Sequence, residues 1–312
     1  MNKHPGARAI RIGTRGSALA LAQAKEVCER LTSIYGKEIS FETCIIKTSG
    51  DKIQDRALAA AGGKGLFTKE LEEALIDESI DLAVHSMKDM PAVLPAGLEI
   101  ACILPREDVR DAFISHIAKS LKDLPAGSIV GTASVRREAF IRHNRPDLKT
   151  VLFRGNVETR LRKLAEGEAH ATLLAAAGLN RLGLSDRITR LIPVDEMLPA
   201  PAQGAIGIET RSADKNTRKL IAAIHDTATG IAIEAERAFL GELDGSCRTP
   251  IAALAHAGDG KVTMKGAILT LDGARIYETA REGSAGEAAA LGRDAAQELL
   301  QRGGKDVFRH AG

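Results

Sequence analysis

The stretch IRIGTRGSALALAQAKEVCERL, residues 10–31, contains the change of pattern that decides the fold. Its first four residues are typical of a short strand, and residues 14–17 form a polar turn with a glycine. Apolar residues then recur at the spacing of one helix face. That face consists of Leu21, Ala24, Val27 and Leu31. A strand followed directly by an amphipathic helix is the first half of a βαβ unit, which predicts an α/β fold.

The same alternation continues to residue 104. Residues 41–47, 80–84 and 98–104 are rich in strand-forming residues, and a helix is predicted between the first two of these runs. Thr68 is predicted to cap that helix, and Glu70 and Glu72 lie near its positive end. Strands separated by helices indicate a mainly parallel sheet.

The middle of the chain repeats this pattern. Strands are predicted at 128–131, 150–153 and 171–174. Thr132, Ala133 and Ser134 open a helix that carries Arg136 and Arg137. Asn156 is predicted to cap the next helix. Residues 192–201 are proline-rich and indicate a linker, after which residues 205–209 are predicted to return the chain to the first sheet.

The C-terminal part differs from the rest. A helix at 231–243 and a loop at 244–248 precede three predicted strands, at 251–257, 262–271 and 275–279. A helix at 286–301 follows. Three strands and a helix predict a small α+β domain.

Composition excludes several classes of protein. The chain has 312 residues, a length typical of two or three domains. It has no apolar run long enough for a transmembrane helix and no signal-peptide pattern near its start. Its four cysteines show no C-x-x-C spacing, which argues against a zinc site or a disulfide framework. We therefore expect a cytoplasmic protein without a metal or a membrane partner.

The formal net charge of +2 hides an uneven distribution. Residues 131–190 carry 12 basic and 6 acidic side chains, and ten of those 12 are arginine. Arginine forms paired hydrogen bonds with carboxylate or phosphate, and several of these arginines follow predicted strands. The pattern predicts an anion site, although solvated helix faces are an alternative for any one arginine. Nucleic acid is disfavoured because aromatic residues make up only 3% and the whole chain is nearly neutral.

Three further motifs carry potential chemistry. The loop of residues 62–65 contains Lys64 and lacks the spacing of a P-loop, so an anion cradle and a plain surface loop both remain open. Asp89, beside Lys88 after a predicted strand, is a candidate general acid or base, with a structural turn as the alternative. Cys247 lies in a loop beside Arg248 and is a candidate nucleophile or attachment point.

In their joint order, these motifs resemble the hydroxymethylbilane synthase (porphobilinogen deaminase) family over nearly the whole chain. The matching segments are residues 11–20, 62–67, 84–89, 106–113, 131–137, 154–161, 177–183, 203–209 and 245–247.

The resemblance implies two α/β domains like the halves of a periplasmic binding protein, with mainly parallel sheets, and a small C-terminal α+β domain. It implies boundaries at residues 1–104 with about 203–224 for the first domain, 105–202 for the second and 225–312 for the third. It also implies a monomeric transferase that joins four porphobilinogen molecules head to tail with loss of ammonia. The product, 1-hydroxymethylbilane, is released by hydrolysis in tetrapyrrole and heme biosynthesis.

The resemblance further implies a dipyrromethane cofactor bound covalently to Cys247, and Asp89 as the catalytic carboxylate. The residues that would hold the carboxylates of cofactor and substrate, or contact them otherwise, are Arg15, Ser17, Lys64, Ser86, Lys88, Thr132, Ser134, Arg136, Arg137, Arg154, Gly155, Arg160, Arg181, Gln203 and Gly204. Three positions depart from residues common in the family: Ala60, Ala133 and Ala202, the last standing where glycine is usual. The alternatives are a non-enzymatic two-domain anion-binding protein, which gives Cys247 no role, and a DNA-binding regulator, which lacks a recognisable helix-turn-helix.

Overall fold

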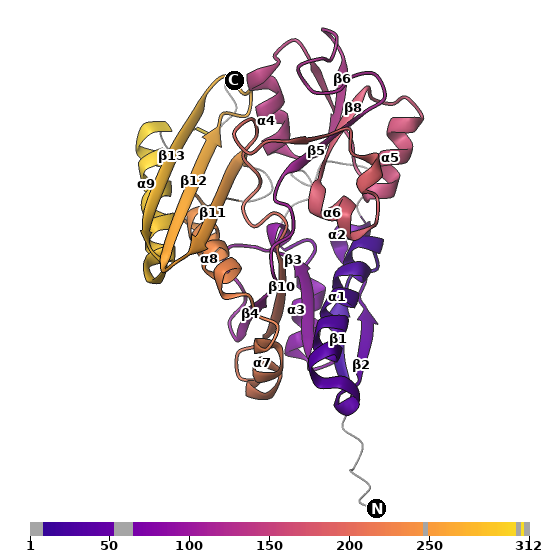
Figure 1. Ribbon diagram of the computed structural model, residues 1–312, viewed down its shortest axis with the longest axis vertical. Coiled ribbons are helices and arrows are strands. Elements are labelled where there is room, and N and C mark those ends of the chain that lie inside the picture. Colours follow the sequence, from indigo (N-terminus) through magenta and orange to yellow (C-terminus); the bar gives the residue numbers. More distant parts are fainter. Residues whose placement is uncertain (1–8, 53–64, 246–248, 304–306, 309–312) are drawn as a thin grey trace, which may run out of the picture.

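The computed structural model describes residues 9–52, 65–245, 249–303 and 307–308, and these form three separate sheets (Figure 1). The first sheet has the order β2-β1-β3-β10-β4. Its strands are β1 (Ile10–Thr14), β2 (Phe41–Ile45), β3 (Leu82–Ser86), β4 (Leu98–Ile103) and β10 (Ile206–Arg211). Only β10 runs against its neighbours, so the predicted return of the chain to this sheet is confirmed.

In the described part of the chain, four helices accompany the first sheet. They are α1 (Ala18–Tyr35), α2 (Ser49–Lys52), α3 (Lys69–Ile76) and α7 (Lys215–Ala222). The Ser17 hydroxyl caps α1 by accepting a hydrogen bond from the Ala20 amide at 3.3 Å. The capping role predicted for Thr68 is wrong, because its backbone is not in the extended conformation that a capping side chain needs, and no capping hydrogen bond forms.

The second sheet has the order β7-β6-β8-β5-β9, and again one strand, β5, runs against its neighbours. Its strands are β5 (Asp111–Ser115), β6 (Ile129–Thr132), β7 (Lys149–Leu152), β8 (Ala171–Ala175) and β9 (Arg190–Ile192). Its helices are α4 (Val135–Asn144), α5 (Val157–Ala165) and α6 (Ala176–Arg181). The element pattern did not indicate β5, which is buried at all five positions and therefore shows no alternation.

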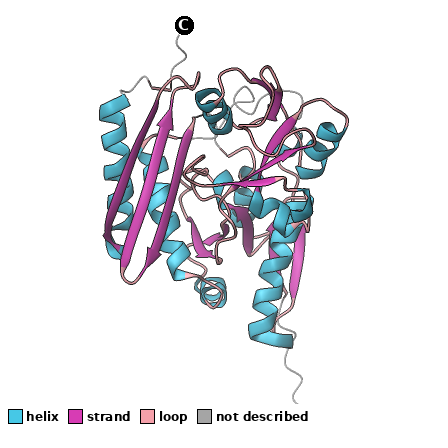
Figure 2. Cartoon of the chain, turned by 45° about the horizontal axis from the view of Figure 1, so that its top comes forward, coloured by secondary structure: helices cyan, strands magenta, loops and turns pink. Residues whose placement is uncertain are grey.

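The third sheet consists of the three strands predicted for the C-terminal α+β domain, which form an antiparallel meander. Its strands are β11 (Ile251–Gly258), β12 (Lys261–Leu269) and β13 (Ile276–Ser284), and its helices are α8 (Thr227–Glu242) and α9 (Ala288–Gly303). Figure 2 shows the two helices lying along one face of the three strands. None of the helices within the described ranges is both long and apolar enough to span a membrane.

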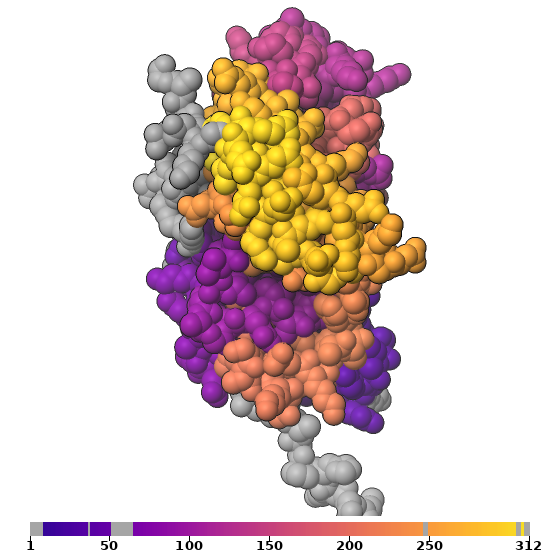
Figure 3. Space-filling model, turned by 90° about the vertical axis from the view of Figure 1, so that its left-hand side faces the viewer, coloured from indigo at the N-terminus to yellow at the C-terminus, as the bar shows by residue number. Residues whose placement is uncertain are grey.

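Apolar packing joins the third sheet to the rest of the molecule. Its second face packs against α4, where Phe140 and Ile141 share one buried cluster with Leu254 and Leu269. In Figure 3 the C-terminal elements, in yellow, lie across the boundary between the parts built on the first and second sheets. The C-terminal part therefore borders both the part built on the first sheet and the part built on the second sheet.

Two chain segments cross between the first and second sheets. The carboxylate of Glu236 accepts hydrogen bonds from both segments. Arg106, which follows β4, forms hydrogen bonds with Glu236 of α8 at 2.6 and 3.0 Å. The same carboxylate accepts a hydrogen bond at 2.5 Å from the amide of Ala202, which lies just before β10. It accepts another at 2.7 Å from the amide of Ala255 in β11. Glu236 thus ties α8 and β11 to both crossings.

Candidate active site

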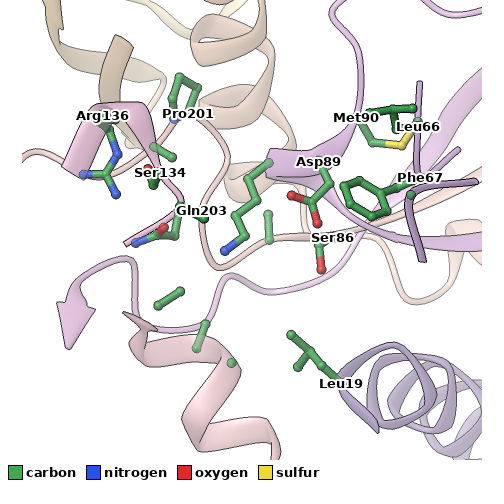
Figure 4. Close-up of a pocket in the computed structure, with 18 of the residues that line it drawn as sticks. Leu19, Leu66, Phe67, Ser86, Asp89, Met90, Ser134, Arg136, Pro201 and Gln203 are labelled. Atoms are coloured by element: carbon green, nitrogen blue, oxygen red, sulfur yellow. The ribbon is translucent and has the colours of Figure 1, made fainter. Parts of the chain in front are cut away.

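A cavity of about 1100 Å³ lies where the three parts meet. Residues from the first sheet, the second sheet and the loop after α8 all line it, and part of this lining is drawn in Figure 4. Among the described lining residues, eight are Lys or Arg and only two, Asp89 and Asp244, are acidic. The cavity is therefore strongly electropositive, as expected for an anion site.

Most residues singled out in the sequence line this one cavity. They are Arg15, Ser17, Ser86, Lys88, Asp89, Ser134, Arg136, Arg137, Arg154, Gly155, Arg160, Arg181, Gln203 and Gly204. Thr132 is buried at the end of β6 and is not among the lining residues. Its hydroxyl accepts a hydrogen bond from the Ser134 amide at 3.1 Å. Lys64, Ala60 and Cys247 lie outside the described residues. Gly245 and Thr249, the described residues on either side of 246–248, both line the cavity.

The first wall is the carboxyl edge of the first sheet. Arg15 and Ser17 follow β1, and Lys88 and Asp89 lie in a single 3-10 turn (Met87–Asp89) directly after β3. Figure 4 shows Asp89 beside Ser86 and Phe67, facing the cavity. Because the carboxyl ends of these parallel strands share one edge, residues far apart in sequence meet here.

Lys88 lies in a positive environment. Burial lowers its pKa, Asp89 raises it in part, and the nearby Arg137 lowers it further. A second carboxylate close to Lys88 would favour its charged form, so this position is well suited to bind an anionic ligand.

Gln23 is a polar residue of this wall that the sequence reasoning missed. Its side chain is buried on α1, and its amide donates a hydrogen bond to the Ser86 hydroxyl at 2.8 Å. A glutamine on the apolar face of a helix was the available signal, because buried polar side chains require a partner.

Phe67 forms an apolar part of the same wall. The Arg15 guanidinium lies over its ring, 4.2 Å from the centroid, a cation–π contact that fixes the arginine at the cavity.

The second wall contains a buried ion cluster centred on Asp111 of β5. Arg136 and Arg137 each donate to this carboxylate at 2.7 Å, and the Gln203 amide donates to it at 3.0 Å. Burial raises the pKa of Asp111, but the two arginines outweigh that effect and hold the pKa well below its usual value. The alternative of solvated helix faces is therefore wrong for Arg136 and Arg137, which are only 4% and 5% exposed.

Arg160 adds a further buried cation to this wall. Its Nε donates to the Gly155 carbonyl at 2.9 Å. Burial, together with Arg137 and Arg154, lowers its pKa to about 10, although Asp89 acts in the opposite direction. The positive charge of the second wall therefore exceeds the negative charge that the described residues supply.

Arg181 connects the two walls. It donates to Glu26 of α1 at 3.2 Å and to the Gly204 carbonyl at 3.0 Å. Gly204 has φ = +89°, and a Cβ there would lie 2.4 Å from the Glu107 carbonyl oxygen, so only glycine fits. Ala202, where glycine is usual, also has a positive φ of +62°.

Comparisons with known proteins show which proteins this chain is similar to. A family model described as "Porphobilinogen deaminase, dipyromethane cofactor binding domain" matches residues 10–219, and its C-terminal domain model matches residues 231–301. Porphobilinogen deaminase of Nitrobacter hamburgensis is 58% identical over 95% of this chain and 94% of its own length. The Paracoccus denitrificans protein is 53% identical over 96% of both chains. The chloroplastic protein of Pisum sativum is 54% identical over 96% of this chain and 83% of its own.

A solved structure, an ABC transporter periplasmic substrate-binding protein from Coxiella burnetii, has 13% identity and a TM-score of 0.44, covering 70% of this chain and 92% of its own. The family models and the relatives cover both the cavity walls and the C-terminal part. The chain therefore belongs to the porphobilinogen deaminase family.

Proposed function

We propose that this chain is the hydroxymethylbilane synthase in which Asp89 is the catalytic carboxylate and Cys247 carries the dipyrromethane cofactor. The observation that carries the assignment of residues is the cavity itself, in which Asp89 lies among eight cations. The reaction is the head-to-tail condensation of four porphobilinogen molecules, followed by hydrolysis to 1-hydroxymethylbilane. The non-enzymatic anion-binding alternative is not favoured, because it leaves Asp89 and Cys247 without a role.

The residues of the cavity fit a dipyrromethane. Each pyrrole of this cofactor bears an acetate and a propionate, so it is a polyanion. Arg136 Nε is buried without a hydrogen-bond partner, and burial lowers the pKa values of Lys88, Arg136 and Arg160. Added carboxylates would compensate these charges. When bound, the cofactor supplies the free pyrrole carbon to which the first substrate unit is joined.

In this proposal Asp89 acts on the substrate. In each condensation the bond between the aminomethyl carbon and nitrogen breaks, and a carbon–carbon bond to the terminal pyrrole forms. The proton lost from that pyrrole carbon leaves with the departing ammonia as ammonium. Asp89 stabilises the positive charge that develops on the substrate as ammonia departs, and it accepts and returns the proton.

The second wall holds the substrate. Arg137 and Arg160 bind its carboxylates, while Asp111 and main-chain carbonyls fix the orientation of Arg136 and Arg137. Lys64, Thr132 and Ser134 belong to the same proposal as further contacts.

Intact-protein mass spectrometry tests this proposal. The purified protein should exceed its sequence mass by two pyrrole units, and Cys247→Ala should lack that excess, because its thioether cannot form. Cys44→Ala is the control and should keep the excess mass; Cys44 is partly buried and is not the proposed attachment residue. Asp89→Ala should keep the excess mass and bind porphobilinogen without turnover. An active wild-type protein at its bare sequence mass would refute the cofactor assignment, and turnover by Asp89→Ala would refute the role of that carboxylate.

We also propose that the protein works as a cytoplasmic monomer without a nucleic-acid partner. The near-neutral net charge disfavours a nucleic-acid partner, and four cysteines without C-x-x-C spacing fit a reducing compartment. Light scattering coupled to gel filtration should give a molar mass close to 33.1 kDa, plus the cofactor. A mass near twice that value would refute the monomer.

A further inference from the structure

Lys47 lines the cavity without having been assigned a role by any of the sequence motifs. It lies just after β2, which is the neighbour of β1 in the first sheet. The register aligns Ile45 with Thr14, and the Ile46 amide donates to the Thr14 carbonyl at 2.8 Å. Lys47 therefore follows β2 within one residue of the level at which Arg15 follows β1.

Three adjacent strands thus deliver cations to one edge of the sheet. In the order β3, β1, β2 the cations are Lys88, Arg15 and Lys47. Lys88 and Arg15 are half-buried, whereas Lys47 is exposed. The row therefore runs from the interior beside Asp89 to the solvent, and Lys47 is its outermost member.

The segment that carries Lys47 is attached to the cavity wall. The Gly50 amide donates to the Leu66 carbonyl at 2.7 Å, and the Ser49 amide donates to the Glu70 carboxylate at 2.7 Å. A Cβ at Gly50 would lie 2.3 Å from the Phe67 ring, which shows how closely the segment packs on the residue beneath Arg15. The backbone at Lys47 is therefore held in place next to the Arg15–Phe67 pair.

The charge of Lys47 is not used elsewhere in the part of the chain that the structure describes. Several other exposed lysines pair with an acid, as Lys69 does with Glu73 and Lys261 with Glu282. No described acidic side chain lies within ion-pairing distance of Lys47. A cation at the mouth of an electropositive cavity, without an acidic partner, is suited to bind an anion that arrives from outside.

We infer that Lys47 binds the carboxylates of the later pyrrole units as the chain grows toward the mouth of the cavity. This inference rests on the proposed function, because only an elongating polycarboxylate brings new anionic groups outward at each step. We expect the cofactor and the first substrate unit to lie deeper, between Asp89 and the second wall, because Lys47 is exposed whereas Lys88 and Arg15 are half-buried. Its removal should therefore affect late additions more than early ones.

The test is a single-turnover experiment on the holoenzyme with limiting porphobilinogen, in which enzyme species carrying one to four added units are separated by intact mass. Lys47→Gln should form the first adduct at the wild-type rate and then accumulate species with two or three units. An exposed ion pair contributes little binding free energy, so we expect the late addition steps to slow about two- to fivefold. Lys47→Arg should restore the wild-type distribution, and added salt should reduce the difference between Lys47→Gln and wild type.

Lys265→Gln is the matched control, because Lys265 is an exposed lysine of β12 that does not line the cavity. It should behave as wild type. A distribution for Lys47→Gln equal to that of Lys265→Gln would overturn the inference, as would a slowed first addition or a lost cofactor mass. These results differ from a failure of the proposed function itself, in which the wild-type protein would gain no mass from porphobilinogen.

Discussion

Asp111 and Arg137 form a buried ion pair, with Oδ1 2.7 Å from Nη2, at the rear of the cavity. Asp111 binds Arg136 at the same distance, so one carboxylate holds two guanidinium groups that lie next to each other on α4. The main-chain carbonyls of Leu198 and Leu173 each accept one further hydrogen bond, from Arg136 and Arg137 respectively. The pair therefore fixes the second wall before any anion binds, which lowers the ordering cost of binding.

Asp111→Asn should be strongly destabilising. Removing the charge leaves two buried guanidinium groups with no acidic partner at this position, which costs about 3–5 kcal/mol in the free energy of unfolding. Urea denaturation measures this loss. Asp147→Asn is the control, since its pair with Arg145 is much more exposed, and it should lower the free energy of unfolding far less. Equal losses for the two variants would contradict the importance of burial.

The Asp111 carboxylate should also make the stability of the fold sensitive to acid. The pKa of Asp111 is lower in the folded protein than in the unfolded chain, so its stabilisation is complete above the unfolded pKa of about 4. That stabilisation is lost as the pH falls from there toward the folded pKa. Unfolding free energies measured between pH 5 and 3 should therefore fall less steeply for Asp111→Asn than for wild type.

Glu236→Gln should destabilise the junction of the three parts. Glu236 is fully buried and accepts two hydrogen bonds from Arg106 and two from main-chain amides. An amide at this position leaves Arg106 without its anionic partner, which costs about 3–5 kcal/mol. Glu166→Gln, which breaks the exposed pair with Arg162, should change the unfolding free energy by about 0.5 kcal/mol at most. An unchanged denaturation midpoint for Glu236→Gln would refute this assignment.

Ala202→Gly should stabilise the protein. Ala202 has φ = +62°, a conformation that costs a residue with a Cβ about 1–2 kcal/mol, and the bond from its amide to Glu236 holds it there. Glycine removes this strain but gains entropy in the unfolded chain, so the expected net gain is about 0.5–1 kcal/mol. Ala205→Gly, at a buried position without positive φ, should instead lower the unfolding free energy. A lower free energy of unfolding for both variants would show that the backbone at Ala202 is not strained.

Lys88 should lose its proton at a lower pH than an ordinary lysine. Burial lowers its pKa and Asp89 partly restores it, so Asp89→Asn should lower that pKa further. Competitive acetylation across a pH series, read by peptide mass spectrometry, reports the value. Asp244→Asn changes the second acidic residue among the described lining residues and should leave the pKa of Lys88 nearer to its wild-type value. As the pH rises, neutral Lys88 should weaken anion binding on the alkaline side.

Much of the fold followed from local patterns. The apolar face of α1, the caps at Ser134 and Asn156 and the three strands of the C-terminal meander are set by residues close together in the sequence. Local patterns did not reveal β5, because a strand buried on both faces lacks the alternation that marks a half-buried one. The candidate residues were also found from sequence, since their types and order matched one family.

The sequence by itself determined which side chains were available: an arginine-rich middle segment, Asp89 next to Lys88, and Cys247 in a loop. Only the tertiary structure decided their partners. Asp111 meets Arg136 and Arg137 because β5 enters the sheet beside β8, and Lys47 joins Arg15 because β2 pairs with β1. Such neighbours are far apart along the chain, and whether a charge is paired, buried or open to a ligand depends on which strands lie side by side.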